Sequence, residues 1–253
     1  MSALNQPKNR KKEEAEIWDE WMRGLRPKLA TLCTDGEYEK ILHWTGVDTT
    51  EDGLVLDAGS GISPYGIRLA KAGHDVVAVD ISGAELTEAR REAMRQNVEM
   101  YFVRADIEHL PFRSESVSTV FCGMVLHHLY YALKGTFAEF ARVLRKGGKM
   151  VAFEPSSHDL LEYLFYHPRN PLHLKTPNER PLCPSELRRT LAAAGFSSSK
   201  IEPRVFYSET FFPHLPILFR ICVAAYRPIA FVLGKMDPGG AWDGNYIAIC
   251  SVK

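Results

Sequence analysis

The sequence predicts an α/β fold in which a doubly wound, seven-stranded sheet carries helices on both faces. Short apolar runs alternate with stretches of helical periodicity along most of the chain. Two of these runs, residues 54–57 and 74–80, end in an acidic residue. Side chains at the ends of buried parallel strands meet at one edge of a sheet, where such folds bind ligands. We expect a mostly parallel sheet with an antiparallel last strand.

The first apolar run leads into a glycine turn. Asp57 ends the run, and Gly59 and Gly61 remove side chains where a ligand would approach the backbone. Ser63 can cap the following helix, and Pro64 suits its first position. The open amides of a helix start attract polar or anionic groups. A tight turn without any ligand is the alternative interpretation of this motif alone.

The spacing Asp57-x-Gly59-x-Gly61 resembles motif I of the class I S-adenosylmethionine (SAM) methyltransferases. Residues 122–129, Cys-Gly-Met-Val-Leu-His-His-Leu, resemble the V-L-H-H-L run of the small-molecule members of that family. The resemblance covers roughly residues 55–196. It implies a Rossmann-like sheet, SAM as the cofactor and S-adenosylhomocysteine as its product.

The resemblance also implies which residues hold the cofactor. Asp80 ends the second strand and would accept hydrogen bonds from the ribose hydroxyls. Asp106 would bond the adenine amino group, with Ile107 along the ring; a turn aspartate is the alternative interpretation. The full expected set is Asp57, Gly59, Ser60, Gly61, Asp80, Ile81, Asp106, Ile107 and Gly123.

Methyl transfer requires attack geometry, and a base helps where the acceptor is a hydroxyl or an amine. His127 is the first candidate for a catalytic base and His128 the second, because both follow the fourth strand. Simple packing or capping is the alternative for both. Glu154, at the end of the fifth strand, is a weaker candidate. No metal is required, and the sequence shows no ligand cluster at metal spacing.

Two insertions are expected to form the acceptor pocket, at about residues 154–183 and 207–240. Within them and the N-terminal region, the candidate substrate contacts are Trp18, Glu154, Tyr163 and Phe211. The apolar run 217–233 fits buried helices, a lid over a lipid-like acceptor, a membrane-surface element or a dimer contact. We expect two regions: an N-terminal helical cap at 1–50, with residues 1–12 disordered, and a SAM-binding domain at 51–253.

Composition limits the partners. Lysine plus arginine and aspartate plus glutamate number 31 each, so the chain has no general attraction for nucleic acid. The Asn/Asp-Pro-Pro-Tyr motif of base methyltransferases is also absent. Five scattered cysteines and no apparent signal peptide or membrane span favour a cytoplasmic protein. The expected partner is a small or lipid-like acceptor, with transient membrane-surface contact and a monomeric or homodimeric state left open.

Two other functions compete with methyl transfer. A nicotinamide-dependent oxidoreductase would share the glycine turn, but Pro64 stands where its third glycine belongs, and the leading Asp57 does not fit. A non-catalytic partner with a SAM-type fold is opposed by the intact acidic sites. The sequence leaves open the identity of the acceptor and whether oxygen, nitrogen, carbon or sulfur is methylated.

Overall fold

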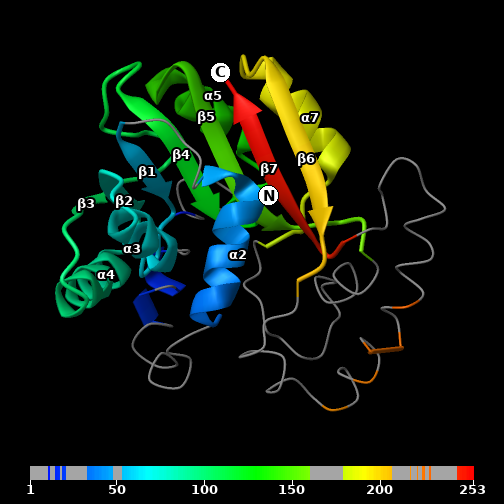
Figure 1. Ribbon diagram of the computed structural model, residues 1–253. Coiled ribbons are helices and arrows are strands. Elements are labelled where there is room, and N and C mark those ends of the chain that lie inside the picture. Colours follow the sequence, from blue (N-terminus) through cyan, green and yellow to red (C-terminus); the bar gives the residue numbers. More distant parts are fainter. Residues whose placement is uncertain are drawn as a thin grey trace.

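The part of the chain that the computed structural model describes contains one seven-stranded sheet, with the strand order β3-β2-β1-β4-β5-β7-β6 (Figure 1). They are residues 11, 15–17, 19–20, 33–47, 53–159, 179–206, 217, 221, 224–225, 228 and 244–253. The strands are β1 (Val55–Ala58), β2 (Val76–Asp80), β3 (Tyr101–Arg104), β4 (Val117–Gly123), β5 (Leu144–Pro155), β6 (Ser198–Arg204) and β7 (Tyr246–Val252). Strand β7 runs antiparallel to both of its neighbours, β5 and β6. The predicted fold class is therefore confirmed.

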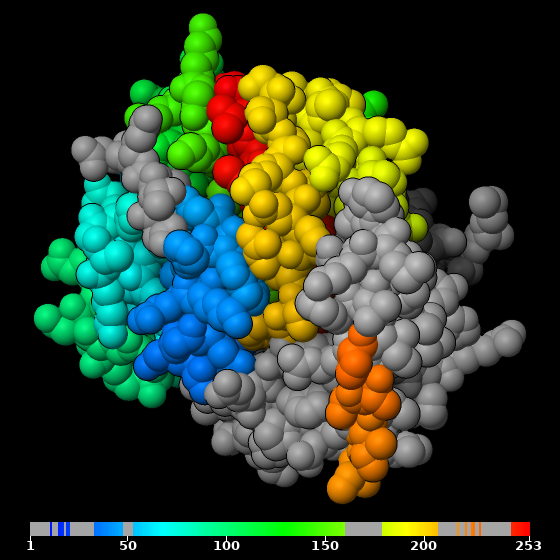
Figure 2. Space-filling view, turned by 45° about the vertical axis from the view of Figure 1, so that its right-hand side comes forward, coloured from blue at the N-terminus to red at the C-terminus, as the bar shows by residue number. Residues whose placement is uncertain are grey.

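Helices cover the sheet on both faces. They are α2 (Asp35–Thr45), α3 (Pro64–Lys71), α4 (Gly83–Arg95), the short 3-10 helix η4 (Leu126–His128), α5 (Leu133–Val143) and α7 (Pro184–Ala193). Neighbouring residues of each central strand point to opposite sides, and two separate cores result. Val55 and Phe121 pack with α2 and α3, whereas Leu56 and Cys122 pack with α5 and α7. In Figure 2, α2 in blue lies beside β6 in gold on one of these faces.

Helix α2 is stabilised at both ends by its own sequence. The Thr34 hydroxyl accepts a hydrogen bond from the Glu37 amide, and the Glu37 carboxylate accepts one from the Thr34 amide, forming a capping box. Gly46 ends the helix with φ at 71°, a conformation that suits glycine. Tyr38, Ile41 and Leu42 are buried against the sheet. Helix α2 is therefore packed into the same core as strands β1 and β5.

Two local expectations differ from the structure. The cations and glycines of residues 145–148 are typical of a helix end, but α5 already ends at Val143, and Leu144 begins β5 by pairing with Val117. The extended backbone at Leu144 lets the strand start there, and Gly147, with φ at 73°, turns within it. Ser63 precedes α3 as expected, yet its hydroxyl does not cap that helix.

Candidate functional site

The glycine turn after β1 fits closely against the segment after β4. Gly59 and Gly61 have φ of 69° and 53°, in the left-handed region that favours glycine. A β-carbon on Gly59 would lie 2.1 Å from a methyl carbon of Val125. The turn therefore contacts the chain just before His127, and the two candidate regions of the sequence meet here.

Asp57 holds the start of helix α3 close to the glycine turn. Its carboxylate accepts hydrogen bonds from the Ser63 hydroxyl at 2.6 Å and from the Gly66 amide. A β-carbon on Gly66 would lie 2.2 Å from the Ser63 oxygen and 2.6 Å from the Asp57 oxygen. Gly66 therefore provides the close approach that a dinucleotide-binding motif obtains from a glycine at position 64. Burial raises the pKa of Asp57 to about 7, against the effect of both hydrogen bonds.

Asp80 joins the glycine turn to the start of α4. One of its carboxylate oxygens accepts the Gly61 amide and the other the Ser82 amide, each at 2.8 Å. The Ile81 amide also donates to this carboxylate, which keeps capacity for a further donor, such as a ribose hydroxyl. Burial raises the pKa of Asp80, while the hydrogen bonds from the Ser82 and Gly61 amides lower it. Ser82 caps α4 by accepting a hydrogen bond from the Glu85 amide at 3.1 Å.

Ser60 provides a test of whether the turn suits a polar ligand. Its hydroxyl oxygen is buried and has no hydrogen-bond partner among the described residues. A buried hydroxyl without a partner is costly, and a ligand that supplies one removes the cost. The Ser60 amide bonds the Val79 carbonyl at 3.0 Å, so the residue is held in place. The site therefore fits a group with polar atoms, as the adenosyl cofactor has.

Asp106 lies on the loop after β3, and one of its oxygens is occupied by a lysine. Lys11 Nζ is 2.5 Å from Asp106 Oδ2 and 2.9 Å from Glu108 Oε1. The other Asp106 oxygen accepts the Glu108 amide at 3.0 Å. Ile107 is buried in the core that α5 shares. Lys11 comes from the N-terminal region, as does Asp19, which contacts the Ser82 hydroxyl; sequence reasoning missed both because no spacing signals them.

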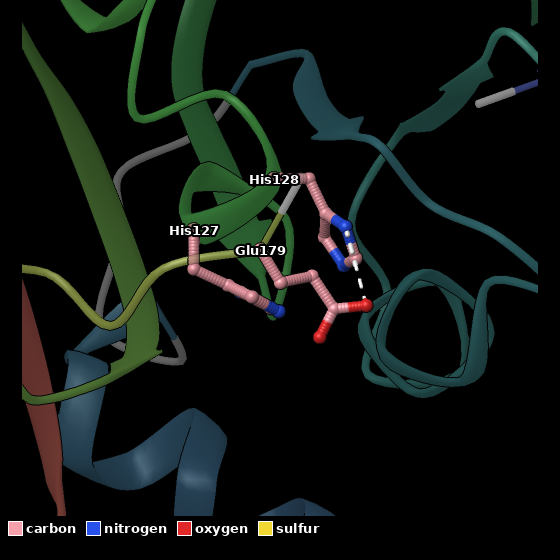
Figure 3. A group of neighbouring side chains, drawn as sticks. All are labelled: His127, His128 and Glu179. Carbon is pink, nitrogen blue, oxygen red and sulfur yellow. Dashed lines mark ion pairs between the residues drawn. The ribbon is translucent and has the colours of Figure 1, made fainter. Parts of the chain in front are cut away.

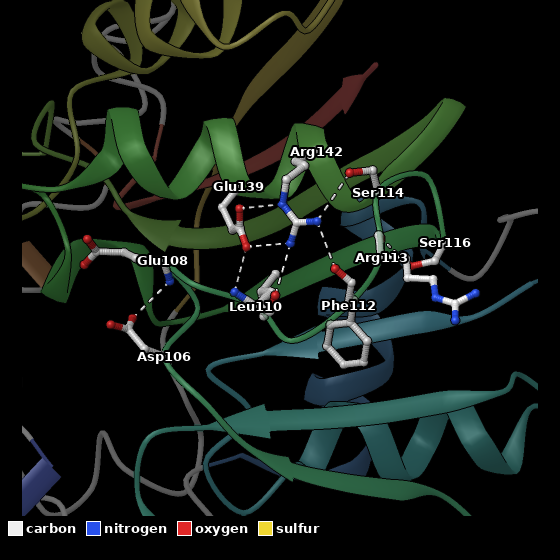
Figure 4. Close-up of polar contacts among 9 residues, drawn as sticks. All are labelled: Asp106, Glu108, Leu110, Phe112, Arg113, Ser114, Ser116, Glu139 and Arg142. Carbon is white, nitrogen blue, oxygen red and sulfur yellow. Dashed lines mark hydrogen bonds and ion pairs between the residues drawn. The ribbon is translucent and has the colours of Figure 1, made fainter.

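The loop that carries Asp106 is held to α5 by an ion pair (Figure 4). Arg142 donates to the carbonyls of Leu110 and Phe112 at 3.1 and 2.9 Å. Glu139 accepts the Leu110 amide at 2.7 Å and pairs with Arg142 through both of its oxygens. The Arg142 guanidinium accordingly holds the pKa of the Glu139 carboxyl below its usual value. The backbone groups of Leu110 and Phe112 belong to the same loop as Asp106, so α5 positions Asp106 indirectly.

Glu154 and His127 form a buried pair where β4 and β5 end. His127 Nδ1 lies 2.7 Å from Glu154 Oε2, and the exposed fractions of the two side chains are 4% and 0%. The Glu154 carboxylate also accepts the Val125 and Leu126 amides, at 2.8 Å each, and the His127 amide. Because this carboxylate acts as an acceptor, His127 Nδ1 is assigned as the donor, which leaves a lone pair on Nε2. Burial raises the pKa of Glu154 to about 8, against these hydrogen bonds.

The backbone between β4 and η4 has an unusual conformation. Met124 has φ at 62°, in the left-handed region that a non-glycine residue rarely adopts, and its amide bonds the Phe153 carbonyl at 2.9 Å. A β-carbon on Gly123 would lie 2.7 Å from the Tyr65 ring. Gly123 was expected to contact the cofactor. The close packing against Tyr65 explains why a glycine is needed at this position even without a cofactor contact. The bend at Met124 directs the chain into η4.

Several predicted residues lie outside the part of the chain that the structure describes. These are Trp18, Tyr163, Phe211, most of both insertions, residues 1–10 and most of the apolar run 217–233. Within that run, Ile217 and Ile221 are described as helical, with exposed fractions of 72% and 58%. Among the described residues, no helix combines the length and apolarity needed to cross a membrane.

Comparison with known proteins assigns the family. Residues 56–152 match the family model described as a methyltransferase domain. A malonyl-[acyl-carrier protein] O-methyltransferase of Hamiltonella defensa is 32% identical over 109 residues, which are 43% of this chain and 40% of that protein. The SAM-dependent Diels-Alderase iccD of Talaromyces variabilis is 32% identical over 120 residues, 46% of this chain and 40% of that protein. The aligned parts thus cover less than half of either relative.

A solved structure extends the likeness of fold over almost the whole chain. It is a SAM-dependent methyltransferase and possible histamine N-methyltransferase from Thermotoga maritima, with a TM-score of 0.65 at 15% identity. The alignment covers 94% of this chain and 98% of that one. The residues matched by the family model include the glycine turn, Asp80 and Asp106. Residues 56–152 therefore carry a methyltransferase domain of the class I SAM-dependent type, the family whose cofactor is S-adenosylmethionine.

Proposed function

We propose that this protein transfers a methyl group from SAM to a small or lipid-linked acceptor. The observation that carries the proposal is the Asp80 carboxylate, which fixes the amides of Gly61 and Ser82 next to the unpartnered Ser60 hydroxyl. These polar groups lie at the carboxyl ends of parallel strands, which is where α/β sheets bind nucleoside ligands. We assign the ribose to Asp80 and the adenine to Asp106 and Ile107.

The cofactor supplies a methyl carbon that the sulfonium has already activated. The residues of this chain must then hold the acceptor in line with that carbon and keep water away. We assign His127 and His128 to the acceptor side, because Val125, just before them, touches Gly59 of the cofactor turn. Glu154 serves as a positioning residue by fixing the His127 ring. It was a substrate candidate, but its full burial favours this role.

Four aromatic rings at this end of the sheet support a bulky acceptor. Phe153 and Tyr246 stack with ring centroids 4.8 Å apart, and Phe206 meets both rings edge-on. Trp44 of α2 adds a ring 6.0 Å from Phe153 and is partly exposed. Phe153 and Phe206 are buried, so Trp44 and Tyr246 provide the partly exposed rings of this group. The similarity to a malonyl-[acyl-carrier protein] O-methyltransferase supports an acceptor that carries an acyl group.

The N-terminal region, residues 1–50, is proposed to act as a cap on the SAM-binding domain at 51–253. Lys11 pairs with Asp106, and Asp19 contacts Ser82, so this region reaches both ends of the expected adenosine site. We keep a cytoplasmic location as a prediction. The four cysteines that the structure describes are free, which agrees with a reducing compartment.

The test is methyl transfer from radiolabelled SAM to a panel of acceptors. The panel should contain acyl-carrier thioesters, quinol-like phenols, amines and thiols. Label appearing in one class identifies the acceptor and supports the proposal. Binding of NAD in place of SAM would favour the oxidoreductase alternative. Cofactor binding without label transfer to any class would favour the non-catalytic alternative.

A further inference from the structure

A second cluster of side chains lies at the acceptor side of the proposed site. It consists of His127, His128 and Glu179 and is called the His-His-Glu cluster here (Figure 3). One donor atom from each residue lies within 4.8 Å of the other two. The two rings are 4.1 Å apart, and His128 Nδ1 is 3.8 Å from Glu179 Oε1. Two imidazoles and a carboxylate thus converge on one point, from segments well separated in the sequence.

The backbone holds the third member of the cluster in place. The Arg180 amide donates to the His127 carbonyl at 3.0 Å, which ties the segment containing Glu179 directly to η4. Leu182, a little further along, pairs with the end of β5 through the Pro155 carbonyl and the Ser157 amide. Glu179 is therefore held beside the histidines by the backbone contacts of Arg180 and Leu182, which follow it.

The donor set is one that transition metals favour. Two histidines and one carboxylate, with a further position left for a ligand, are typical of zinc and other first-row divalent ions. Metal-bound histidines usually donate their second ring nitrogen to a carboxylate or carbonyl, which fixes the tautomer. Glu154 accepts from His127 Nδ1 in this way and leaves Nε2 as the donor atom toward the cluster.

The burial of the cluster also suits an ion. The exposed fractions of the His127, His128 and Glu179 side chains are 4%, 12% and 10%. The three groups are thus largely removed from solvent, where a carboxylate gains from a nearby cation. Zinc ligands lie about 2.0–2.2 Å from the ion, so binding would draw the three donor atoms closer together.

We propose that this protein binds one divalent transition-metal ion of the zinc class through His127, His128 and Glu179. This departs from the expectation from the sequence, in which no metal was required and the two histidines were base candidates. The sequence could not group them with Glu179, which is distant along the chain and has no motif around it.

The ion has a role for the acceptor that rests on the proposed methyl transfer. An oxygen or sulfur atom of the acceptor could complete the coordination and release its proton to solvent more readily. The bond from that atom to the methyl carbon then forms as the sulfur–methyl bond of SAM breaks. The electron pair of the broken bond remains on the sulfur of S-adenosylhomocysteine. Ion binding itself does not depend on this step.

The experiment is equilibrium dialysis of the chelator-treated, full-length protein against Zn²⁺, with Co²⁺ as a spectroscopic probe. Wild type should bind one ion per chain, and Co²⁺ should give visible absorption bands. His128→Gln and Glu179→Gln should each abolish both signals. Glu154→Gln should weaken Zn²⁺ binding by roughly 10–100-fold, the usual effect of altering a group that orients a metal-bound histidine.

Matched controls are His109→Gln and Glu92→Gln, which change the same residue types outside the cluster. They should bind Zn²⁺ as wild type does. SAM binding, measured in parallel without Zn²⁺, should be unchanged in His128→Gln and Glu179→Gln, which shows that they are folded. Absence of Zn²⁺ binding by wild type, or wild-type binding by both variants, would overturn the proposal and leave an ordinary His128–Glu179 ion pair. Failure of wild type to bind SAM would instead overturn the proposed function.

Discussion

His127 Nδ1 lies 2.7 Å from Glu154 Oε2, and both side chains are buried between the ends of β4 and β5. Three backbone amides of the β4–η4 segment also donate to the Glu154 carboxylate. A single carboxylate thus fixes both the path of this segment and the orientation of one imidazole. This pairing distinguishes His127 from His128, which the sequence alone ranks only by position.

Asp57 predicts a pH dependence of stability. Its pKa is about 7 in the folded chain, because burial disfavours the charged form, and its ordinary value is 3.8. As pH rises from about 4 to about 7, the unfolded chain loses this proton first, so the free energy of unfolding falls, by of order a few kcal/mol. Asp57→Asn should remove this part of the fall in urea denaturation measured across the pH range. Asp75→Asn, an exposed change, should keep the wild-type profile; equal profiles in all three proteins would contradict the account.

Gly66 should not tolerate a side chain. In Gly66→Ala the new β-carbon would meet the Ser63 and Asp57 oxygens at 2.2 and 2.6 Å. Overpacking of this kind costs about 1–3 kcal/mol in the free energy of unfolding. Gly135→Ala is the control, since nothing lies within 4 Å of its β-carbon in helix α5. It should stabilise the protein by about 0.5–1 kcal/mol. Thermal denaturation of both variants measures the contrast, and equal effects of the two changes would be inconsistent with it.

Arg142 should support the loop that carries Asp106. Arg142→Gln removes donors to the Leu110 and Phe112 carbonyls. Because its side chain is 36% exposed, solvent offsets part of the loss, and we expect a destabilisation of about 1 kcal/mol with weaker SAM binding. Arg91→Gln, which removes a 68% exposed arginine of α4, should change either quantity little. Unchanged SAM affinity in Arg142→Gln would show that the support of this loop by Arg142 does not contribute to cofactor binding.

The sequence predicted best what depends on neighbouring residues. The strands around Asp57 and Asp80, and the helix start at Pro64, were recognisable from apolar runs, glycine and proline over a few positions. It misjudged Ser63, because the hydroxyl bonds Asp57 and not the helix amides. That choice depends on Gly66, whose missing side chain leaves room for both groups.

Contacts between distant segments could not be predicted from the sequence. The pairing of Lys11 with Asp106 and the approach of Glu179 to His128 join residues with no shared motif or periodicity. The composition of the chain, with its balanced charge, gave no indication of either contact.

Calorimetric binding of SAM, S-adenosylhomocysteine and NAD to wild type, Asp80→Asn and Asp75→Asn tests the role of Asp80 in holding the cofactor. Asp80 is the last residue of β2, and Asp75 directly precedes the first residue of that strand. Asp75→Asn is therefore a matched control. Wild type and Asp75→Asn should bind both adenosyl ligands and not NAD. Asp80→Asn, folded by circular dichroism, should bind SAM more weakly by about 1–3 kcal/mol, the usual loss for hydrogen bonds to a charged group. Tight NAD binding without SAM binding, or undiminished SAM affinity in Asp80→Asn, would contradict the account.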